Sequence, residues 1–305
     1  MTINALFYNI NTGKIEDYTR QGVQDIKDGI IRTPLSPLET FQDDPLRVLR
    51  SIRFAARFGF KCVPELIEAA KNPTVETALY FKISRERVGN EIISMALRDR
   101  FDMALELIIQ TGLWNAIFTL PDAIAWRTET CWDGSKSIDI IKELLPSYTP
   151  DSDEMFRRGF IIGSVLYPLN GWLYQVKPRK TDPVTKYVML ISLKLSVVEA
   201  RTAVLAQTSA SGFVDFIVHI IQNDSSFVTR SKLGMLLRAA GKEWKSFLLL
   251  ARAVVCVDYK DKFDKSTIDS AVSEIQKLYS QWDLGEPWSL HPLLTVCFSF
   301  LLSSQ

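Results

Sequence analysis

Residues 41–60 read FQDDPLRVLRSIRFAARFGF, and this stretch decides the fold. Pro45 stands at a plausible first helical position, apolar residues recur at helical spacing, and Gly59 is a natural stop. Two adjacent aspartates precede this helix. Four cations follow on it at near-helical spacing: Arg47, Arg50, Arg53 and Arg57. The stretch therefore predicts a short helix with one apolar face and one strongly basic face.

The helical pattern continues to the end of the chain. Segments of roughly 10 to 20 residues, joined by short polar turns, indicate an all-α body. Helices are expected at residues 64–72, 84–99, 101–113, 135–145, 153–169, 181–196, 197–207, 211–223, 231–255 and 265–282. No fixed-period repeat supports a solenoid.

The first 35 residues show α/β character in miniature. The pattern predicts an apolar segment at 3–10, a turn at 11–13, a strand at 14–18, a helix at 22–29 and a strand at 30–34. This segment is too small to be a domain. Residues 35–41, LSPLETF, contain Pro37 close behind Pro34 and are expected to form a loop.

Composition argues for a packed protein with a local basic surface. The chain has 305 residues, of which 47% are hydrophobic, enough for one or two cores. Lys and Arg number 36 against 35 Asp and Glu, so global charge does not predict nucleic-acid binding. Residues 45–100, however, hold 11 Lys/Arg and 6 Asp/Glu. Such a local excess can steer phosphates, although a merely solvated helical surface shows the same pattern.

The remaining composition gives expectations about metal and compartment. The four cysteines, Cys62, Cys131, Cys256 and Cys297, are far apart and form no CxxC pair. With only two histidines, the chain is not expected to hold structural zinc, and sparse cysteine use fits a reducing, intracellular compartment. The start lacks the pattern of a secretory signal, and the apolar run at 293–302 is about half the length of a spanning helix. We expect a soluble protein with no membrane partner.

Asp44 and Arg47 are the pair with the most specific chemistry. With Asp44 as the helix cap, Arg47 lies three residues on, and both side chains share one face. The carboxylate only accepts hydrogen bonds and the guanidinium only donates them. Cytosine and adenine place an amino donor beside a ring acceptor and fit this pair, whereas guanine and uracil do not, at a cost on the order of 1–3 kcal/mol. An ordinary cap followed by solvated arginines has the same spacing.

The stretch DDPLRVLRSIRFAARFGF resembles the helix motif of the class II CCA-adding enzymes, the tRNA nucleotidyltransferases that build the CCA end of tRNA. Residues 2–35 resemble the segment between that family's Arg-Arg-Asp motif and its helix motif. KISRERVGNEI at 82–92 resembles the neck motif, and SLKLS at 192–196 and LGMLLRAAGKEW at 233–244 resemble the body of eukaryotic members. The bacterial-type poly(A) polymerases share the early motifs.

The resemblance implies a mainly α fold, in which a helical neck, body and tail follow the residual α/β end of a nucleotidyltransferase palm. The expected parts are the palm remnant at 1–36, the neck with the base-reading helix at 37–110, and the body with a partial tail at 111–305. The partners that the resemblance implies are tRNA, CTP and ATP.

The resemblance also implies roles for single residues. Asp44 is the base-reading carboxylate and Arg47 its partner, and Arg50 and Arg53 match arginines that contact the bound nucleotide. Asp43 stands where the family more often has glutamate. The neck residues Arg85, Glu86 and Arg87, which follow Ser84, are expected to support the helix rather than touch substrate, and Arg85 and Glu86 can pair with neighbouring charges. Simple helix capping and surface pairing account for them equally well.

The family's reaction needs two metal ions, Mg²⁺, held by a DxD carboxylate pair. In the family this pair lies before the point that corresponds to Met1. We therefore expect no catalytic residue and no metal ligand in this chain, and no activity from the chain alone. Asp151 and Asp153 have the DxD spacing but lie in a polar loop, and we do not expect them to bind metal.

At the other end, WSLHPLL at 288–294 resembles the family's tail, with His291 in place of the usual lysine, and the likeness then stops. We expect a chain that is incomplete at both ends. Three hypotheses stay open: a CCA-adding nucleotidyltransferase or its poly(A)-polymerase-like relative, a non-catalytic tRNA-binding remnant, and a helical scaffold without an RNA role.

Overall fold

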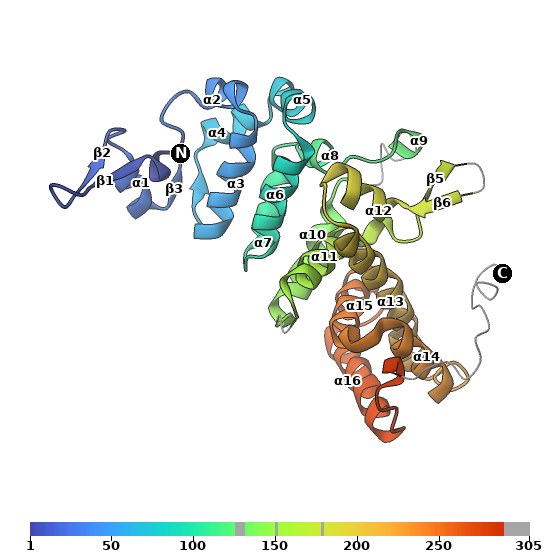
Figure 1. Ribbon diagram of the computed structural model, residues 1–305. Helices are drawn as coiled ribbons and strands as arrows, with labels where there is room; N and C mark the ends of the chain where they lie inside the picture. Colours follow the sequence, from blue (N-terminus) through green and yellow to red (C-terminus); the bar gives the residue numbers. More distant parts are fainter. Residues whose placement is uncertain (126–131, 150–151, 178–179, 290–305) are drawn as a thin grey trace.

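The computed structural model describes residues 1–125, 132–149, 152–177 and 180–289 (Figure 1). Helices make up most of these ranges, and the strands in them form three two-stranded sheets. The elements follow a bent path from the strands of the N-terminal segment to α14 and α16 at the far end (Figure 1). The expected mainly α fold is confirmed.

The N-terminal segment has the predicted α/β character. It consists of η1 Thr2–Asn4, β1 Leu6–Asn9, β2 Lys14–Asp17, α1 Gly22–Asp28 and β3 Ile30–Ile31. β1 and β2 form an antiparallel hairpin. The hydroxyl of Thr2 donates to the buried carboxylate of Asp25 at 2.7 Å, which ties the chain start to α1. Large apolar side chains of the hairpin, Phe7, Tyr8 and Ile15, are exposed.

The segment is joined to the helices through β3, which pairs in parallel with β4 Lys61–Cys62 just after α3. The expectation of a loop at 35–41 is wrong, because residues Pro37–Asp43 form helix α2. Pro37 occupies the first turn, where its missing N–H costs nothing, and Thr40 and Phe41 are buried. Pro37 therefore marks the start of a helix and not a loop.

Five helices form the region that contains the basic stretch, which lies on α3. They are α3 Leu46–Phe58, α4 Pro64–Ala70, α5 Pro73–Lys82, α6 Arg85–Ala96 and α7 Phe101–Gln110. The predicted helix α3 is confirmed, and it ends at Gly59 in the left-handed conformation with φ of 69°. Its apolar residues are buried in contact with α6 and α7, while its arginines stay at least partly exposed. α5 was not anticipated.

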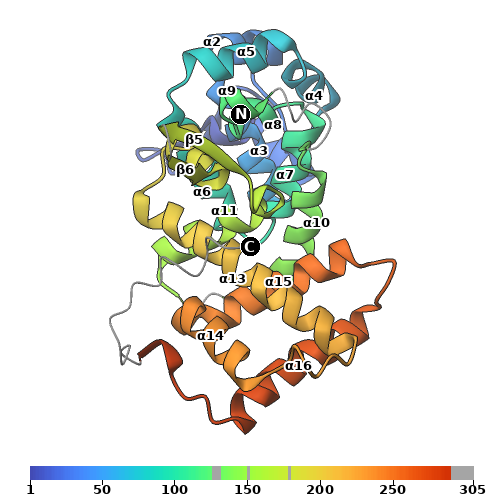
Figure 2. The same cartoon turned by 90° about the vertical axis from the view of Figure 1, so that its right-hand side faces the viewer.

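The remaining helices form a bundle around α13 (Figure 2). They are α8 Trp114–Ile117, α9 Asp122–Ala125, α10 Ser135–Leu144, α11 Glu154–Val165, α12 Val184–Tyr187, α13 Val197–Ile221, α14 Arg230–Ala240, α15 Trp244–Asp258 and α16 Lys265–Gln281. Five of them, α11, α12, α14, α15 and α16, pack on α13. Short 3₁₀ turns, η2 Leu145–Ser147, η3 Tyr167–Leu169, η5 Gly241–Glu243 and η6 Pro287–Ser289, complete the bundle.

Four expected helices in this region are wrong in extent. Residues 181–196 begin as strand β6, Lys180–Pro183, which pairs with β5, Leu173–Lys177, before α12 and the π-helical turn η4, Val188–Ser192. The two helices expected at 197–207 and 211–223 are one continuous helix, α13. The single helix expected at 231–255 breaks into α14 and α15 at Gly241, whose φ of 74° no helix accommodates.

α13 is long and apolar enough to cross a membrane by length and composition, and in this fold it is a core helix. Its packing against α11 depends on small residues. A Cβ built on Gly163 of α11 would lie 2.7 Å from the Cα of Ala203 on α13, and one on Gly159 would lie 2.7 Å from the carbonyl oxygen of Glu199. The two helix backbones therefore approach each other at positions where no larger side chain fits.

We expect Gly163→Ala to lower the free energy of unfolding by about 1–3 kcal/mol, because the added methyl group must push α11 away from α13. Gly234→Ala on α14 is the matched control. The nearest side-chain atom there is 3.8 Å away, and helix propensity predicts a gain of up to about 1 kcal/mol. Denaturant unfolding of both variants, followed by circular dichroism, measures the difference. Equal stabilities would contradict the close helix crossing.

Candidate functional site

The candidate site is the first turn of α3 and the part of α6 that lies beside it. Asp44 ends α2, and its side chain accepts a hydrogen bond from the backbone N–H of Leu46 at 3.1 Å. Its backbone carbonyl accepts from the N–H of Arg47 at 3.0 Å. The expected cap is therefore shifted by one residue, because Pro45 is the N-cap of α3 and the Asp44 side chain bonds to Leu46 from outside the helix. The carboxylate of Asp44 is partly exposed and the side chain of Arg47 is exposed, so both can reach a ligand.

A second arginine, from α6, also reaches Asp44. The Nη2 atom of Arg87 lies 3.5 Å from Oδ2 of Asp44. Ser84 begins α6, and its hydroxyl accepts a hydrogen bond from the backbone N–H of Arg87 at 3.4 Å. The start of α6 therefore places a guanidinium next to the first turn of α3. The pairing with a neighbouring charge that was expected of Arg85 and Glu86 is thus made by Arg87.

Arg50 and Arg53 share one acidic partner, which sequence reasoning missed. The Nε of Arg50 lies 3.3 Å from Oε1 of Glu91, and the Nε of Arg53 lies 2.7 Å from Oε2. Only 11% of the Glu91 side chain is exposed. A nearly buried carboxylate is costly unless it is paired, and here two guanidinium groups pair with it. Glu91 lies inside the quoted neck motif, but spacing gives no sign that it faces the arginines of α3.

Arg85 supports α6 in a way that differs from the expectation. Its guanidinium donates to the carbonyl oxygens of Ser192 and Ala116, at 2.7 Å each, and to that of Ile117. The expected pairing of Arg85 with a neighbouring charge is therefore wrong. Burial lowers the pKa of this guanidinium below its ordinary value. The three carbonyls end α8 and the π-helical turn, so Arg85 attaches α6 to the body.

Glu86, also assigned a supporting role, is exposed and makes no hydrogen bond or ion pair within the described residues. Its expected pairing is not seen there. Gly89, one turn further along α6, completes the attachment that Arg85 begins. A Cβ on Gly89 would lie 1.8 Å from the carbonyl oxygen of Leu193, so α6 rests directly on the backbone of the body.

We tested whether the residues present could hold Mg²⁺. Among the described residues, no group of three His, Cys, Asp or Glu side chains comes together. Asp153 is the N-cap of α11 and accepts from the N–H of Phe156 at 2.9 Å. Its DxD partner Asp151 lies outside the described residues, as do Cys131, His291 and Cys297. The described side chains do not fit a two-metal site, and we derive no metal step from them.

Comparison with known proteins gives a consistent result. The Poly A polymerase head domain matches residues 1–32. The chain is 34% identical to the mitochondrial CCA tRNA nucleotidyltransferase of Saccharomyces cerevisiae over 275 residues, which are 80% of this chain and 50% of that protein. It is 30% identical to a tRNA nucleotidyltransferase of Schizosaccharomyces pombe over 294 residues, 96% of this chain and 59% of that protein.

The chain is a homologue of the CCA tRNA nucleotidyltransferases. Its fold agrees with that of the CCA-adding enzyme of Bacillus stearothermophilus, solved in complex with CTP. The two structures superpose with a TM-score of 0.57 at 19% identity, over 92% of this chain and 57% of that one. The chain thus spans 50% to 59% of the relatives compared here.

The paired arginines of α3 give a first prediction for the site. Glu91→Gln removes the charge that Arg50 and Arg53 share, and leaves two like charges one turn apart on α3. We expect a loss of stability of about 1–3 kcal/mol, smaller at high salt, where the repulsion is screened. Thermal melts at low and high salt measure this. Glu86→Gln, which removes an exposed carboxylate from the same helix, is the control and should change stability by under about 0.5 kcal/mol.

Arg85 gives a second prediction. Arg85→Lys keeps the positive charge but cannot reach three carbonyl oxygens with one ammonium group. Because buried carbonyls then lose their donors, we expect a destabilisation of about 2–4 kcal/mol. Hydrogen exchange should show faster exchange in α6 and in residues 188–193, with α16 unchanged. Uniform acceleration along the whole chain would argue against a specific attachment of α6.

Proposed function

We propose that this chain is the nucleotide-selecting and tRNA-binding part of a CTP/ATP:tRNA nucleotidyltransferase, which adds CCA to the 3′ end of tRNA. One observation carries the proposal: Asp44 and Arg47 stand on the exposed first turn of α3, with Asp44 oriented by its hydrogen bond to Leu46. The relatives' names support it, since they are tRNA nucleotidyltransferases. The proposal includes the three parts expected from the sequence: the palm remnant at 1–36, the neck at 37–110 and the body with a partial tail at 111–305.

In this proposal the edge of the incoming base lies against Asp44 and Arg47. The carboxylate accepts a hydrogen bond from the amino group of cytosine or adenine, and the guanidinium donates to the neighbouring ring nitrogen. Guanine and uracil place an acceptor against the carboxylate and a ring N–H against the guanidinium. Both contacts are then repulsive, which is costly for desolvated polar groups. The site thereby selects C and A without a nucleic-acid template.

Arg87 and Glu91 hold this edge in place. The Nη2 atom of Arg87 lies 3.5 Å from Oδ2 of Asp44, which restricts the orientation of that carboxylate. Arg50 and Arg53 contact the rest of the nucleotide in this proposal, and Glu91 limits the rotamers they can adopt. Pre-oriented guanidinium groups lose less entropy when they bind a ligand.

The chemical step needs metal-bound carboxylates, which the described residues do not supply. We propose that a nucleotidyltransferase head provides them and holds Mg²⁺ there. A poly(A)-polymerase-like activity is the alternative within the same family, and the use of CTP separates the two. An intracellular location fits the yeast relative, whose name places it in mitochondria.

The test is nucleotide incorporation by this chain fused behind the head of the yeast relative. The substrate is tRNA that ends at the discriminator base, and each nucleoside triphosphate is supplied separately. We expect CTP and ATP to be used in preference to UTP and GTP. Asp44→Asn keeps a capping oxygen but presents an amino donor, so it should lose about 10-fold or more of this selectivity. Arg47→Ala should weaken the use of both CTP and ATP.

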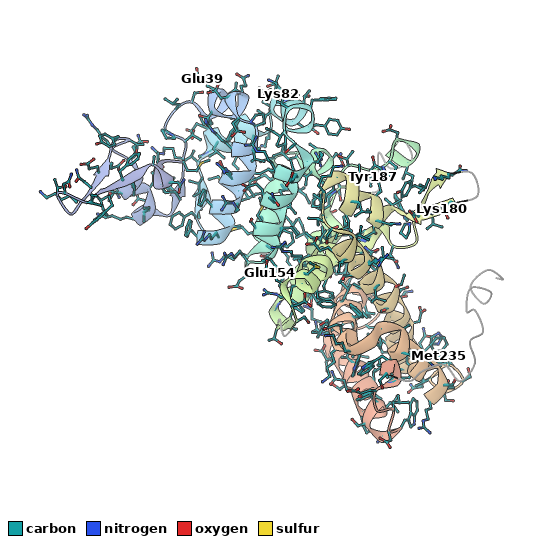
Figure 3. The ribbon with its side chains drawn as sticks, viewed as in Figure 1. Glu39, Lys82, Glu154, Lys180, Tyr187 and Met235 are labelled. Atoms are coloured by element: carbon teal, nitrogen blue, oxygen red, sulfur yellow. The ribbon has the colours of Figure 1, made fainter. Side chains whose placement is uncertain are left out.

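Glu39→Ala is the control, because it removes an exposed carboxylate from the neighbouring helix α2 (Figure 3). It should leave the preference for C and A unchanged. If Asp44→Asn also left that preference unchanged, the base-reading assignment would be wrong. Addition of A alone, without C, would favour the poly(A)-polymerase alternative.

A further inference from the structure

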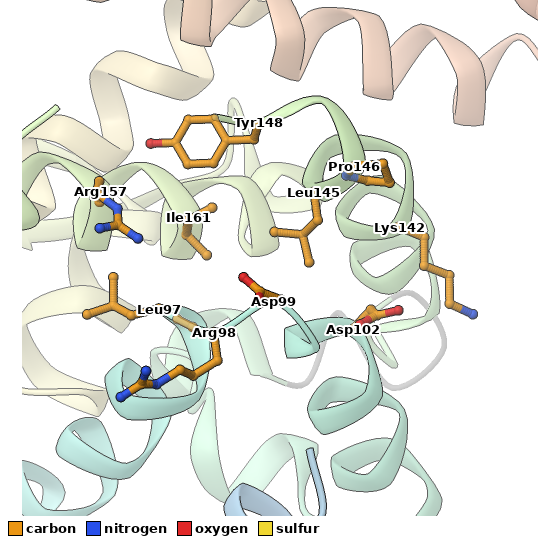
Figure 4. A pocket seen from close by; sticks show the side chains of 11 residues that line it. Leu97, Arg98, Asp99, Asp102, Lys142, Leu145, Pro146, Tyr148, Arg157 and Ile161 are labelled. Atoms are coloured by element: carbon orange, nitrogen blue, oxygen red, sulfur yellow. The ribbon is translucent and has the colours of Figure 1, made fainter. Parts of the chain in front are cut away.

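Two hollows adjoin on the side of the molecule where α3 and α6 end and α11 begins. The larger, about 350 Å³, lies between the α6–α7 turn and the segment from α10 to α11 (Figure 4). The smaller, about 260 Å³, lies beside the last turns of α3 and α6. Leu97 and Arg98 line both. We call the joined hollows the junction groove, since they form one continuous surface.

The junction groove is basic. The cationic residues that line it are Arg53, Arg57, Arg98, Lys142, Arg157 and Arg158. Three carboxylates face it, those of Asp99, Asp102 and Glu154. This groove is separate from the first turn of α3, where the base-reading pair lies, because it adjoins the opposite end of that helix.

Several of these cations already have partners. Arg158 pairs with Glu154 and lies 3.8 Å from Glu199, and Lys142 pairs with Glu106. Arg53 is held by Glu91. Within the described residues, no acidic partner is found for three others: Arg57, Arg98 and Arg157. The net positive charge of the groove therefore rests on these three side chains.

Buried polar atoms in the groove lack partners. The Nε atoms of Arg157 and Arg158 and the hydroxyl of Tyr148 are buried without a hydrogen-bond partner in the described structure. Burial raises the pKa of Tyr148 to about 12, so its hydroxyl stays a donor at neutral pH. All three groups are donors, and a buried donor without an acceptor is costly. These three donors therefore lack acceptors in the described structure, although carboxylates line the groove, and an anionic oxygen would satisfy them.

Ordinary helix electrostatics explains only part of this arrangement. The C-terminal end of α3 attracts cations, and the guanidinium of Arg100 packs against Gly59 there. The same effect accounts for Arg57. It does not account for Arg157, which comes from the second turn of α11, near the N-terminal end of that helix. A helix N-terminus favours negative charge, so an anion beside it is stabilised.

We propose that the junction groove binds phosphodiester groups of an RNA strand through Arg57, Arg98 and Arg157. The inference rests on the proposed function for the identity of the RNA, a tRNA, and not for the chemistry of the groove. Arg57 and Arg98 are exposed and span the two hollows, so they contact neighbouring phosphates of one strand. Arg157, with Tyr148, donates to the phosphate that enters the larger hollow. Such contacts position RNA without reading its sequence.

The test measures the affinity of the 305-residue chain for tRNA, without nucleotide, as a function of salt. Arg57→Gln with Arg98→Gln should weaken binding about 10-fold at low salt and reduce the slope of log K against log salt by about 2. The matched control, Lys82→Gln with Lys260→Gln, changes the net charge equally at exposed sites outside the groove, and Lys82 lies on the far side from Glu154 (Figure 3). It should change affinity less than twofold.

Further arms separate the outcomes. An unrelated RNA hairpin should show the same loss, since the groove contacts backbone; this result can hold even if the selection of C and A fails. Inorganic triphosphate, measured by calorimetry, tests the other phosphate source. If the double variant lost triphosphate binding but kept tRNA affinity, the proposal would be overturned. An equal effect of groove and control variants on tRNA binding would overturn it too.

A measurement on the unmodified chain does not depend on variant folding. Phenylglyoxal modifies accessible arginines, and mass spectrometry locates the products. Bound tRNA should protect Arg57 and Arg98 at least threefold, while Arg20 and Arg201, outside the groove, stay reactive. Undiminished modification of Arg57 and Arg98 under saturating tRNA would contradict the proposal.

Discussion

The pairing of Glu91 with Arg50 and Arg53 is the interaction on which the rest of the site depends. The two ion pairs connect α3 and α6 through polar side chains, in addition to the apolar contacts between these helices. A carboxylate with so little exposure is stable only while both helices keep their positions, because its loss of solvent must be offset by the two guanidinium groups. The pair therefore fixes how far apart the two helices lie. That spacing in turn determines whether Arg87 of α6 reaches Asp44.

α6 also connects α3 to the helical body. Its start is held by Arg85 on three backbone carbonyls, and Gly89 lets it lie against the backbone at Leu193. Backbone contacts of this kind tolerate little sliding, since neither partner is a flexible side chain. In the proposed function, base selection at α3 therefore depends on the packing of the helical body, although the body itself contacts no base.

The distribution of charge along the chain fits the proposed contact with RNA. The whole chain is nearly neutral, with a formal net charge of +1, so it has no general attraction for nucleic acid. Some of its cations are concentrated on α3 and around the junction groove. Local fields of this kind can steer phosphates even on a nearly neutral protein. In the functions proposed above, the two ends of α3 have separate tasks, with the base at the first turn and RNA backbone near the last.

The sequence by itself determined the elements whose signals are local. Pro45 and Gly59 delimit α3, and the contact of Asp44 with the start of that helix follows from the chemistry of helix starts. The N-terminal α/β segment follows from its short apolar stretches and its turn residues. Sequence patterns could not show that 197–221 is a single helix, because the helices that pack on α13, such as α11, α15 and α16, come from other parts of the chain. They also could not pair Glu91 with α3 or bring residues 57, 98 and 157 to one groove. Such juxtapositions depend on how helices far apart in the chain pack together, and only the tertiary structure decided them.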